Sequence, residues 1–504
     1  MDTAATAPPG TTAEGAATAD GATTADGATT AATGATRPRT RAAALRHPRL
    51  DPYWLALGLF AAFATLSVCR YRRMATMSWD LGIFEQAIRA YAHFQAPIAD
   101  LKGPGANILG DHFSPITALL APLYRIFPSP VTLLVAQAAL FALSAVPVAR
   151  TAARLLGRGR GLAIGTAYGL AWGLQRAVDF DFHEICFAVP LIAFSLEAVI
   201  RRRWYAAMLW AAPLVFVKED MGATVAAIGA VVAICALRER VPGIAPLAIA
   251  LMGFGVLGSA LALGVVIPGF NGAGAYDYWD KVGGGGGSDA TIPLVTALRT
   301  LLWVLLPTTG LLALRSPLLL AAVPTLGWRF VSHDEHYWGT DWHYSAVLMP
   351  VVFLALVDAL DRIGKSRRAW LISYARQIPT AVCAAALALT TSLPLAELTE
   401  ETTYRKPPQV SGVERLLDRI PDGATVEANV GPIARLTSRC RVFWVGSTQD
   451  VTPQYLALAE PPDRTVRQEL AYAKQLHPKA RYEALATSGG YFLLRLKSPS
   501  AAGR

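Results

Sequence analysis

Long apolar segments recur along the chain between residues 53 and 395, separated by short polar stretches. They lie at about 53–68, 130–150, 161–176, 185–200, 204–217, 221–237, 243–267, 291–314, 316–330, 344–361 and 375–395. An α-helix needs about 20 apolar residues to cross the hydrocarbon core of a bilayer. The pattern therefore predicts an α-helical polytopic membrane protein with about eleven transmembrane helices. The boundaries are least defined around 204–237 and 291–330, where the segments are short.

The polar connections between these segments fall into two alternating classes. One class is basic and reads RTAARLLGRGRG, RRRW, RERV, LRSP and DRIGKSRR. The other is acidic and aromatic and reads DFDFHE, VKED, YDYWDKVGGGGGSD and SHDEHYWGTDWH. Because basic loops are retained in the cytoplasm, the N-terminus is predicted inside and the acidic loops outside. The exception is Arg70, Arg72 and Arg73 after the first helix, which either snorkel at the interface or contact a phosphate.

Composition agrees with a membrane protein and excludes some other classes. Hydrophobic residues make up 53% of the 504 residues and charged residues only 16%, against about 25% charged in soluble domains. The net charge of +10 does not indicate a nucleic-acid partner, because Lys and Arg cluster between apolar segments. The five cysteines form no CxxC pair, so neither a disulfide framework nor a zinc site is predicted.

The two ends of the chain differ from the apolar middle, residues 51–395. Residues 1–50 are predicted to form a disordered cytoplasmic tail, because Ala, Thr and Gly offer little to bury. After residue 396, strand-like runs alternate with helical stretches such as VRQELAYAKQL, and YEALATSGGYFLLRLK reads as a hairpin. The alternation predicts a small α/β domain over residues 396–504, which is extracytoplasmic if the number of transmembrane helices is odd.

The predicted outer loop over residues 70–129 is far longer than a connection needs. Its stretch SWDLGIFEQAIRAYAHFQAPI has helical spacing after Asp80 and predicts a helix along the membrane surface. Asp80 would lie at or near the N-cap, where it is either a helix cap or a functional carboxylate. Asp111 and His112 follow in the same loop.

Further acidic and histidine residues collect on the predicted outer side. Besides the three above, the set contains Asp179, Asp181, His183, Glu184, Glu219, Asp220, His333, Asp334, Glu335, His336, Asp341 and His343. Charge at the end of a span is costly unless it lines an aqueous cavity. Each residue alone is readily a solvated loop charge, but together they could supply a general base and hold a divalent cation. Asp111 and His112 are the metal-ligand candidates, although no HExxH or comparable spacing accompanies them.

Several of these strings resemble a known family. SWDLGIFEQAI, LGDHFSPI and DFHEICFAVPLIAFSLEA look like the bacterial membrane proteins catalogued as domain of unknown function twenty-seventy-nine, over about residues 50 to 500. The layout of that family is similar to that of GT-C glycosyltransferases, which transfer a sugar from a polyprenyl-phosphate donor. The resemblance implies a multi-pass protein of the bacterial plasma membrane. It also implies that Asp80 is the counterpart of the catalytic carboxylate.

The leading hypothesis is a glycosyltransferase that moves a sugar from a polyprenyl-phosphate lipid to an unidentified acceptor at the outer face. Asp80 would be the general base. The residues that would position the donor phosphate, directly or through a cation, or offset its charge are Asp111, His112, His183, Glu184, Lys218 and Arg72. A transporter or lipid flippase is an alternative, although charged span centres and internal repeats are not visible. A non-catalytic envelope protein is another.

Overall fold

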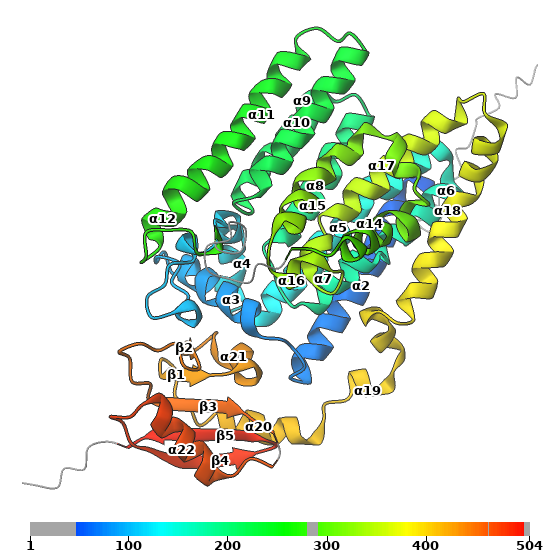
Figure 1. The fold of residues 1–504 in the computed structure, drawn as a ribbon. Helices are drawn as coiled ribbons and strands as arrows, with labels where there is room; N and C mark the ends of the chain where they lie inside the picture. The colour runs from blue at the N-terminus through cyan, green and yellow to red at the C-terminus, as the bar shows by residue number, and fades with distance from the viewer. Residues whose placement is uncertain (1–46, 280–290, 462, 498–504) are drawn as a thin grey trace, which may run out of the picture. The chain divides into compact units, whose positions relative to one another are not determined.

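The computed structural model describes residues 47–279, 291–461 and 463–497. Apart from its last four residues, the predicted disordered tail lies outside this range. α-Helices dominate the described residues, and a small sheet follows near the C-terminus (Figure 1). Each apolar segment predicted from the sequence coincides with at least one helix. The hydrophobic periodicity therefore identified the helical part of the chain correctly.

Five helical stretches in the described part of the chain are long and apolar enough to cross a membrane. They are Pro48–Arg72 with α2 (Asp51–Arg72), α5 (Pro130–Leu156), α10 (Met221–Arg238), Ile244–Phe270 with α11 (Ile244–Leu261), and α18 (Ala369–Thr390). Shorter apolar stretches include α8 (Ile185–Ile200), α9 with its continuation (Trp204–Phe216), α14 (Leu294–Thr309) and Pro317–Val331, which ends in α15 (Val323–Val331). Because these are shorter than about 20 residues, the number of eleven crossings stays a prediction.

Local sequence explains where the helices break. The predicted segment 161–176 forms two helices, α6 (Arg158–Gly169) and α7 (Trp172–Asp179). α9 (Trp204–Ala211) passes into a 3-10 turn at Ala212–Phe216, which has a proline in its first turn. Proline cannot donate the backbone hydrogen bond that continues an α-helix. These breaks give the bundle short helices whose ends carry the loops of the candidate site.

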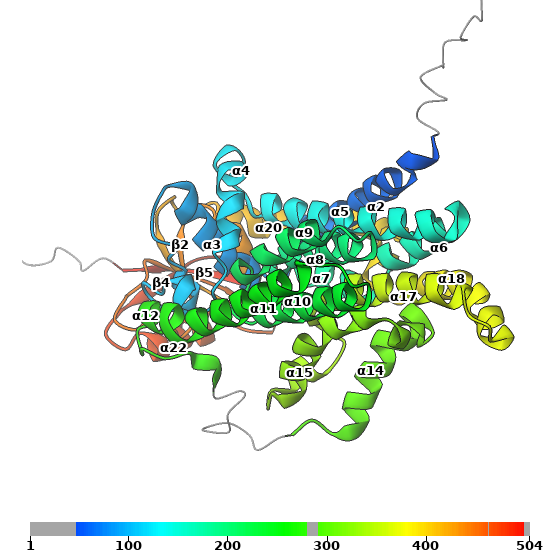
Figure 2. The same cartoon turned by 90° about the horizontal axis from the view of Figure 1, so that it is seen from above.

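Packing within the bundle follows the size and polarity of the residues. α10 and α11 lie side by side (Figures 1 and 2), and a Cβ atom at Gly222 or at Gly255 would clash with the backbone of the other helix. Small residues at such contacts allow helices in membranes to approach closely. α17 (Leu348–Gly364) is buried along nearly all of its length. In contrast, α11 exposes Ile249, Val256 and other apolar residues, as expected of a surface that faces lipid.

The C-terminal sheet has five strands in the order β2-β1-β3-β5-β4. β1 (Thr425–Ala428) pairs in parallel with β2 (Arg441–Trp444) and β3 (Tyr455–Ala459), whereas β5 (Tyr491–Leu496) is antiparallel to β3 and to β4 (Tyr482–Ser488). The helices α20 (Pro408–Leu417), α21 (Val430–Leu436) and α22 (Val466–Leu476) accompany the sheet. The alternating strands and helices and the terminal hairpin predicted from the sequence are thus present.

The amphipathic helix predicted after Asp80 is α3 (Trp79–Ala92), but its surroundings differ from the expectation. Ile83 and Ala87 belong to one buried cluster together with residues of the C-terminal region such as Ile433. A Cβ atom at Gly82 would clash with Ile433 of α21. The C-terminal region therefore covers part of α3, and the position of this helix along a membrane surface stays a prediction. The boundary of a separate domain at residue 396 stays a prediction, since this core is shared.

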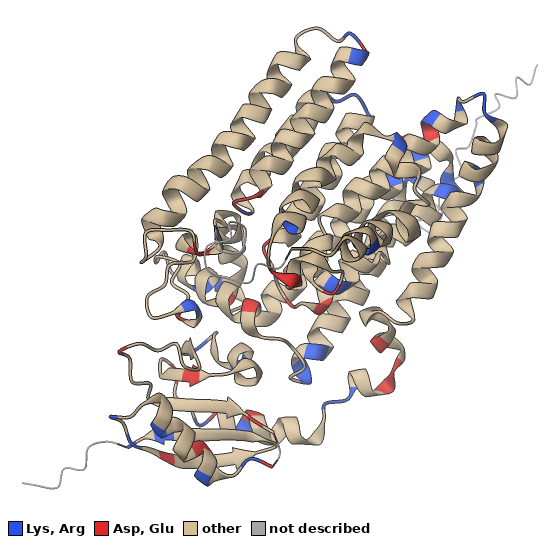
Figure 3. Ribbon diagram, in the orientation of Figure 1, with Lys and Arg blue, Asp and Glu red and all other residues tan. Residues whose placement is uncertain are grey.

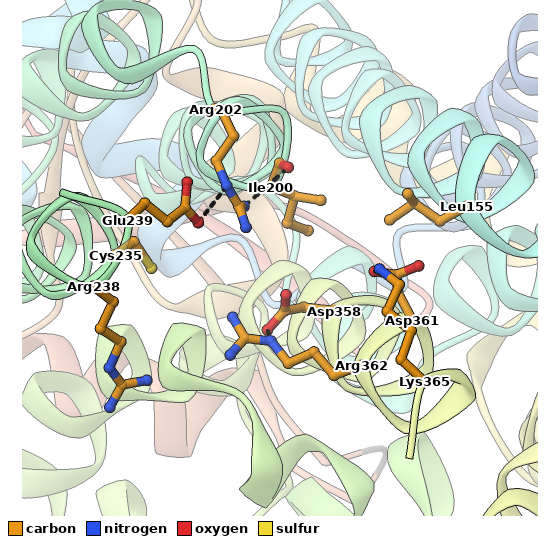
Figure 4. Close-up of a pocket in the computed structure, with 10 residues that line it drawn as sticks. All are labelled: Leu155, Ile200, Arg202, Cys235, Arg238, Glu239, Asp358, Asp361, Arg362 and Lys365. Atoms are coloured by element: carbon orange, nitrogen blue, oxygen red, sulfur yellow. Dashed lines mark hydrogen bonds and ion pairs between the residues drawn. The ribbon is translucent and has the colours of Figure 1, made fainter. Parts of the chain in front are cut away.

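Basic residues gather at one end of the bundle, where α8 joins α9, α10 joins α11, and α17 joins α18 (Figure 3). A polar pocket of about 280 Å³ lies at this end (Figure 4). Arg202 contacts Glu239 at 2.5 Å, and Arg362 contacts Asp358 at 2.9 Å. Because much of its charge is paired, this pocket carries little excess of positive charge.

Candidate active site

A second pocket, of about 230 Å³, brings together residues from the loops that the sequence places on the acidic side. Its lining residues are Trp79, Asp80, His112, Phe180, His183, Lys218, Glu219, Asp220, Tyr276, Tyr278, Trp328, Tyr337, His343 and Tyr344. They come from α3 and the loop after it that carries His112, from the loops that precede α8, α10 and α17, from α15 and α16 (Glu335–Trp338), and from the segment after α12 (Ile267–Phe270). Segments far apart in the sequence therefore meet at one polar cavity, which we call the candidate active site.

Asp80 lines this cavity from the second position of α3. The N-cap residue is Ser78, and no side chain caps the helix. No hydrogen bond or ion pair of the Asp80 carboxylate is found with any residue that the structure describes. Burial raises the pKa of Asp80, and the nearby charge of His183 offsets this only in part. A half-buried carboxylate that has a raised pKa and lines a cavity has the properties of a general base.

The turn that precedes α8 fixes the beginning of α3. The backbone N–H of Ser78 donates to Asp181 Oδ2 at 2.8 Å. Both residues adopt left-handed backbone conformations, with φ of 64° and 60°, which are uncommon for residues other than glycine. Gln137 of α5 donates to the Asp181 carbonyl and accepts from the His183 N–H at 3.0 Å. Asp181 and Gln137 therefore determine where Asp80 lies.

Three contacts between acidic and basic side chains form the polar wall beside Asp80. Lys218 Nζ lies 3.2 Å from Glu184 Oε1, and His183 Nδ1 lies 2.5 Å from Glu184 Oε2. His112 Nδ1 lies 2.9 Å from Glu219 Oε1. Burial alone would lower the pKa of Lys218, but Glu184 and the neighbouring acids raise it well above its ordinary value. A buried carboxylate therefore holds each of these two basic groups in place: Glu184 holds Lys218, and Glu219 holds His112.

The directions of the pKa shifts favour the charged forms of His112 and Glu219. Burial lowers the pKa of His112, but the Glu219 carboxylate and other nearby acids more than offset this, so the net pKa is raised. Burial raises the pKa of Glu219, but His112 and Lys218 bring it down to about 2. Tyr276 also donates to Glu219, at 2.8 Å. The site therefore places Lys218 and His112, each paired with a buried carboxylate, near Asp80.

Aromatic and histidine rings form the opposite wall. The rings of His183 and His343 stack with centroids 3.8 Å apart. The loop that carries His343 is held by Arg329 of α15, a fully buried cation that donates to the carbonyls of Tyr337 at 2.7 Å and Gly339 at 2.6 Å. The sequence did not single out Arg329, because a basic residue at the end of an apolar helix reads as a loop charge.

The sequence-predicted residues converge in part. Asp80, His112, His183 and Lys218 line the cavity, and Glu184 lies behind its wall with no exposed surface. Asp111 is not among the lining residues, but its carboxylate contacts Lys102 at 3.0 Å and lies 3.9 Å from His112. His336 is two-thirds exposed and contacts Asp334 instead of lining the cavity. Arg72 lines a different pocket, described below.

The geometry gives little support to the expected metal ligands. In the described residues no group of three or more His, Cys, Asp or Glu side chains is arranged to hold a metal ion. Asp111 is engaged by Lys102, and His112 by Glu219. A divalent cation at Asp111 and His112 would have to displace these contacts.

Comparisons with known proteins identify the family. Residues 70–493 match the model of a family described as a predicted membrane protein (DUF2079). The chain belongs to this family. The sequence resemblance noted above is thereby confirmed, and the chain is a membrane protein. Among curated proteins no match was found.

The fold also resembles solved structures. ArnT from Cupriavidus metallidurans bound to undecaprenyl phosphate superposes with a TM-score of 0.56 at 15% identity, over 90% of this chain and 99% of that chain. The same protein in the apo state gives a TM-score of 0.48 at 13% identity, over 84% and 94%. At this identity the bound structure shows a shared fold and nothing more. It agrees with the GT-C-like layout that the sequence predicted.

Proposed function

We propose that this member of the family is a membrane glycosyltransferase that moves a sugar from a polyprenyl-phosphate donor to an acceptor outside the cytoplasm. The observation that carries the proposal is the position of Asp80. Its carboxylate is half-buried, has no hydrogen bond or ion pair with the described residues, and lines a cavity with Lys218 and His112. The fold shared with ArnT, whose structure contains undecaprenyl phosphate, agrees with a lipid phosphate as the ligand.

The chemistry assigns different roles to these side chains. An acceptor hydroxyl attacks the anomeric carbon of the sugar, and Asp80 takes the proton of that hydroxyl. The bond between the anomeric carbon and the phosphate oxygen breaks, and the polyprenyl phosphate leaves with the electron pair. Lys218 and protonated His112 stabilise the negative charge that develops on the phosphate, since fixed cations in a buried site need no reorganisation. Asp80 then returns its proton to water.

The other polar residues around the cavity act through these groups. Glu184 holds Lys218 and contacts His183, while Glu219 holds His112. Asp111 would steady the loop that carries His112 through its contact with Lys102. A transporter, a flippase and a non-catalytic envelope protein remain the alternatives, but none is favoured by a specific feature of the described residues.

Binding of undecaprenyl phosphate tests the proposal without a known acceptor. The full chain, purified in detergent, is titrated with undecaprenyl phosphate and separately with undecaprenol, which has the same tail but no phosphate. Two cations at the phosphate should favour undecaprenyl phosphate by at least ten-fold, since charge-assisted contacts contribute about 1.5–3 kcal/mol each. His112→Gln and Lys218→Gln should each reduce the preference, whereas the exposed-site control Lys479→Gln should not.

Two outcomes of this titration would contradict the proposal. Equal affinities for the phosphate and the alcohol in the wild-type chain would contradict the proposal. Wild-type preference retained in both His112→Gln and Lys218→Gln would also contradict it, because the phosphate would then bind elsewhere. Melting temperatures of all variants establish that they are folded.

A further inference from the structure

A separate pocket with a basic lining lies at the end of α2, apart from the candidate active site. It has a volume of about 440 Å³. Its lining residues are Cys69, Arg72, Arg73, Thr403, Tyr404, Arg405, Lys406 and Glu414. None of these residues lines the cavity that contains Asp80. The walls come from the last turn of α2 and from α19 (Glu401–Tyr404) with the residues that follow it.

Part of the positive charge around this basic pocket is balanced by nearby carboxylates. The pairs are Arg405 with Glu401, Lys406 with Glu414, and Arg435 with Glu414. Arg435 also donates to the carbonyl oxygens of Tyr71 at 2.9 Å and Arg72 at 3.3 Å, which fixes the end of α2 against α21. These contacts shape the pocket, but they do not balance the charges of Arg72 and Arg73.

Arg72 and Arg73 supply the unbalanced charge. Arg73 is only 3.8 Å from Glu397, and that carboxylate already accepts from Arg70 at 2.9 Å. The Nε atom of Arg73 is buried without a hydrogen-bond partner. The guanidinium of Arg72 makes no hydrogen bond or ion pair with the residues that the structure describes, and it is exposed. The pocket therefore presents guanidinium groups that the chain itself does not satisfy.

The position of this pocket relative to the membrane indicates which kind of ligand can enter it. α2 lies in a stretch long and apolar enough to cross a membrane, and the stretch ends at Arg72. Arg72 consequently lies at the level of the lipid headgroups, where long basic side chains meet phosphate. Tyr404, which is 57% exposed, lines the same pocket, and tyrosine is enriched at membrane–water interfaces. Cys69 lies one turn of α2 deeper.

We propose that this pocket binds the phosphate group of an anionic lipid headgroup in the leaflet at this end of α2. Guanidinium groups match the geometry of phosphate and bind it through two parallel hydrogen bonds. Snorkelling alone would explain one arginine directed toward water. It does not explain a cavity lined by four cations, Arg72, Arg73, Arg405 and Lys406, with one carboxylate, Glu414. The proposal is independent of the glycosyltransferase function.

A lipid-partition experiment tests this site. The full chain is reconstituted in nanodiscs of phosphatidylcholine with a small fraction of fluorescent phosphatidylglycerol, and energy transfer from the protein reports the enrichment of the anionic lipid. Arg72→Gln should reduce the enrichment about five-fold, the effect of one basic residue near a membrane surface. Folding should be unaffected, since this side chain has no partner to lose. Arg72→Gln/Arg73→Gln should abolish the enrichment.

Matched controls separate this site from other sources of charge. Arg467→Gln and Arg467→Gln/Arg481→Gln remove the same charge from exposed positions of the C-terminal region and should leave the enrichment unchanged. An equal effect of these controls would overturn the proposal, as would wild-type enrichment in Arg72→Gln/Arg73→Gln. Displacement of the lipid by millimolar glycerol phosphate would also overturn it, because the site would then take a free phosphate and not a headgroup.

Discussion

At the scale of single residues, the candidate site depends on a few buried polar groups whose environments differ sharply. Asp80 is half-buried and lacks a fixed partner among the described residues, whereas Asp181 is buried and accepts a hydrogen bond from the N–H of Ser78. Burial raises the pKa of Asp181 to about 7, and its hydrogen bond with Ser78 opposes the rise. The two carboxyl groups therefore have different roles: Asp80 lines the cavity, and Asp181 supports the beginning of α3.

The raised pKa of Asp181 predicts how stability depends on pH. A carboxyl group whose pKa is higher in the folded than in the unfolded chain favours folding when protonated, so its contribution is lost as pH rises from about 4 to about 7. Asp181→Asn retains an acceptor for Ser78 and tolerates a positive φ, but it cannot ionise. Relative to wild type, the variant should gain stability as pH rises through this range.

Melting temperatures of wild type and Asp181→Asn between pH 4.5 and 8 measure this difference in stability. Each unit of pKa shift corresponds to about 1.4 kcal/mol. The conservative Asp334→Asn is the matched control, because Asp334 lies in another loop outside the cavity. Parallel pH profiles for wild type and Asp181→Asn would show that Asp181 is ionised in the folded chain already at low pH.

At the scale of elements, close packing of α10 and α11 sets the position of the loop that carries Lys218 and Glu219. Gly222 lies in the first turn of α10, a few residues after this loop, and packs against Gly255 of α11. Ser259 of α11 also donates to the carbonyl of Glu219. The contact between these two helices thus supports one wall of the cavity.

Gly222→Ala should destabilise the folded chain by about 1–3 kcal/mol, since a Cβ atom there meets backbone that cannot move aside. Gly253→Ala is the matched control, because that glycine lies in α11 with open space around its Cβ position. Thermal unfolding in detergent measures both. Equal melting temperatures for the two variants would mean that the helices do not pack through this glycine pair.

Many of these elements could be predicted from the sequence, because helical periodicity and strand alternation are local properties. The positions of Asp80, His112, His183 and Lys218 around one cavity followed from the charge of the loops. In contrast, Gln137 lies inside an apolar helix, and Arg329 at the end of another. Their contacts join segments far apart along the chain, so no local pattern could reveal them. Arg72 was assigned to the donor phosphate for its charge alone, but the fold places it in another pocket.

At the scale of the whole molecule, the C-terminal region holds the helix that carries Asp80. Thr437 donates to Glu85 of α3, and Gln86 donates to the carbonyl of Val442 at 2.9 Å. Arg441 forms two hydrogen bonds to Asp100, at 2.7 and 2.8 Å. The C-terminal region, including strand β2, is consequently part of the scaffold of the site.

The central claim is that Asp80 takes a proton during sugar transfer, and one substitution tests it most directly. Asp80→Asn preserves the size and the helix position of the side chain but removes the proton-accepting charge. The full chain in vesicles is supplied with undecaprenyl-phosphate sugars, and release of undecaprenyl phosphate is measured. Wild type should turn over at least one donor, and Asp80→Asn should be slower by about 10²–10⁴-fold with an unchanged melting temperature, as expected for loss of a general base. Turnover by Asp80→Asn at the wild-type rate would contradict the claim.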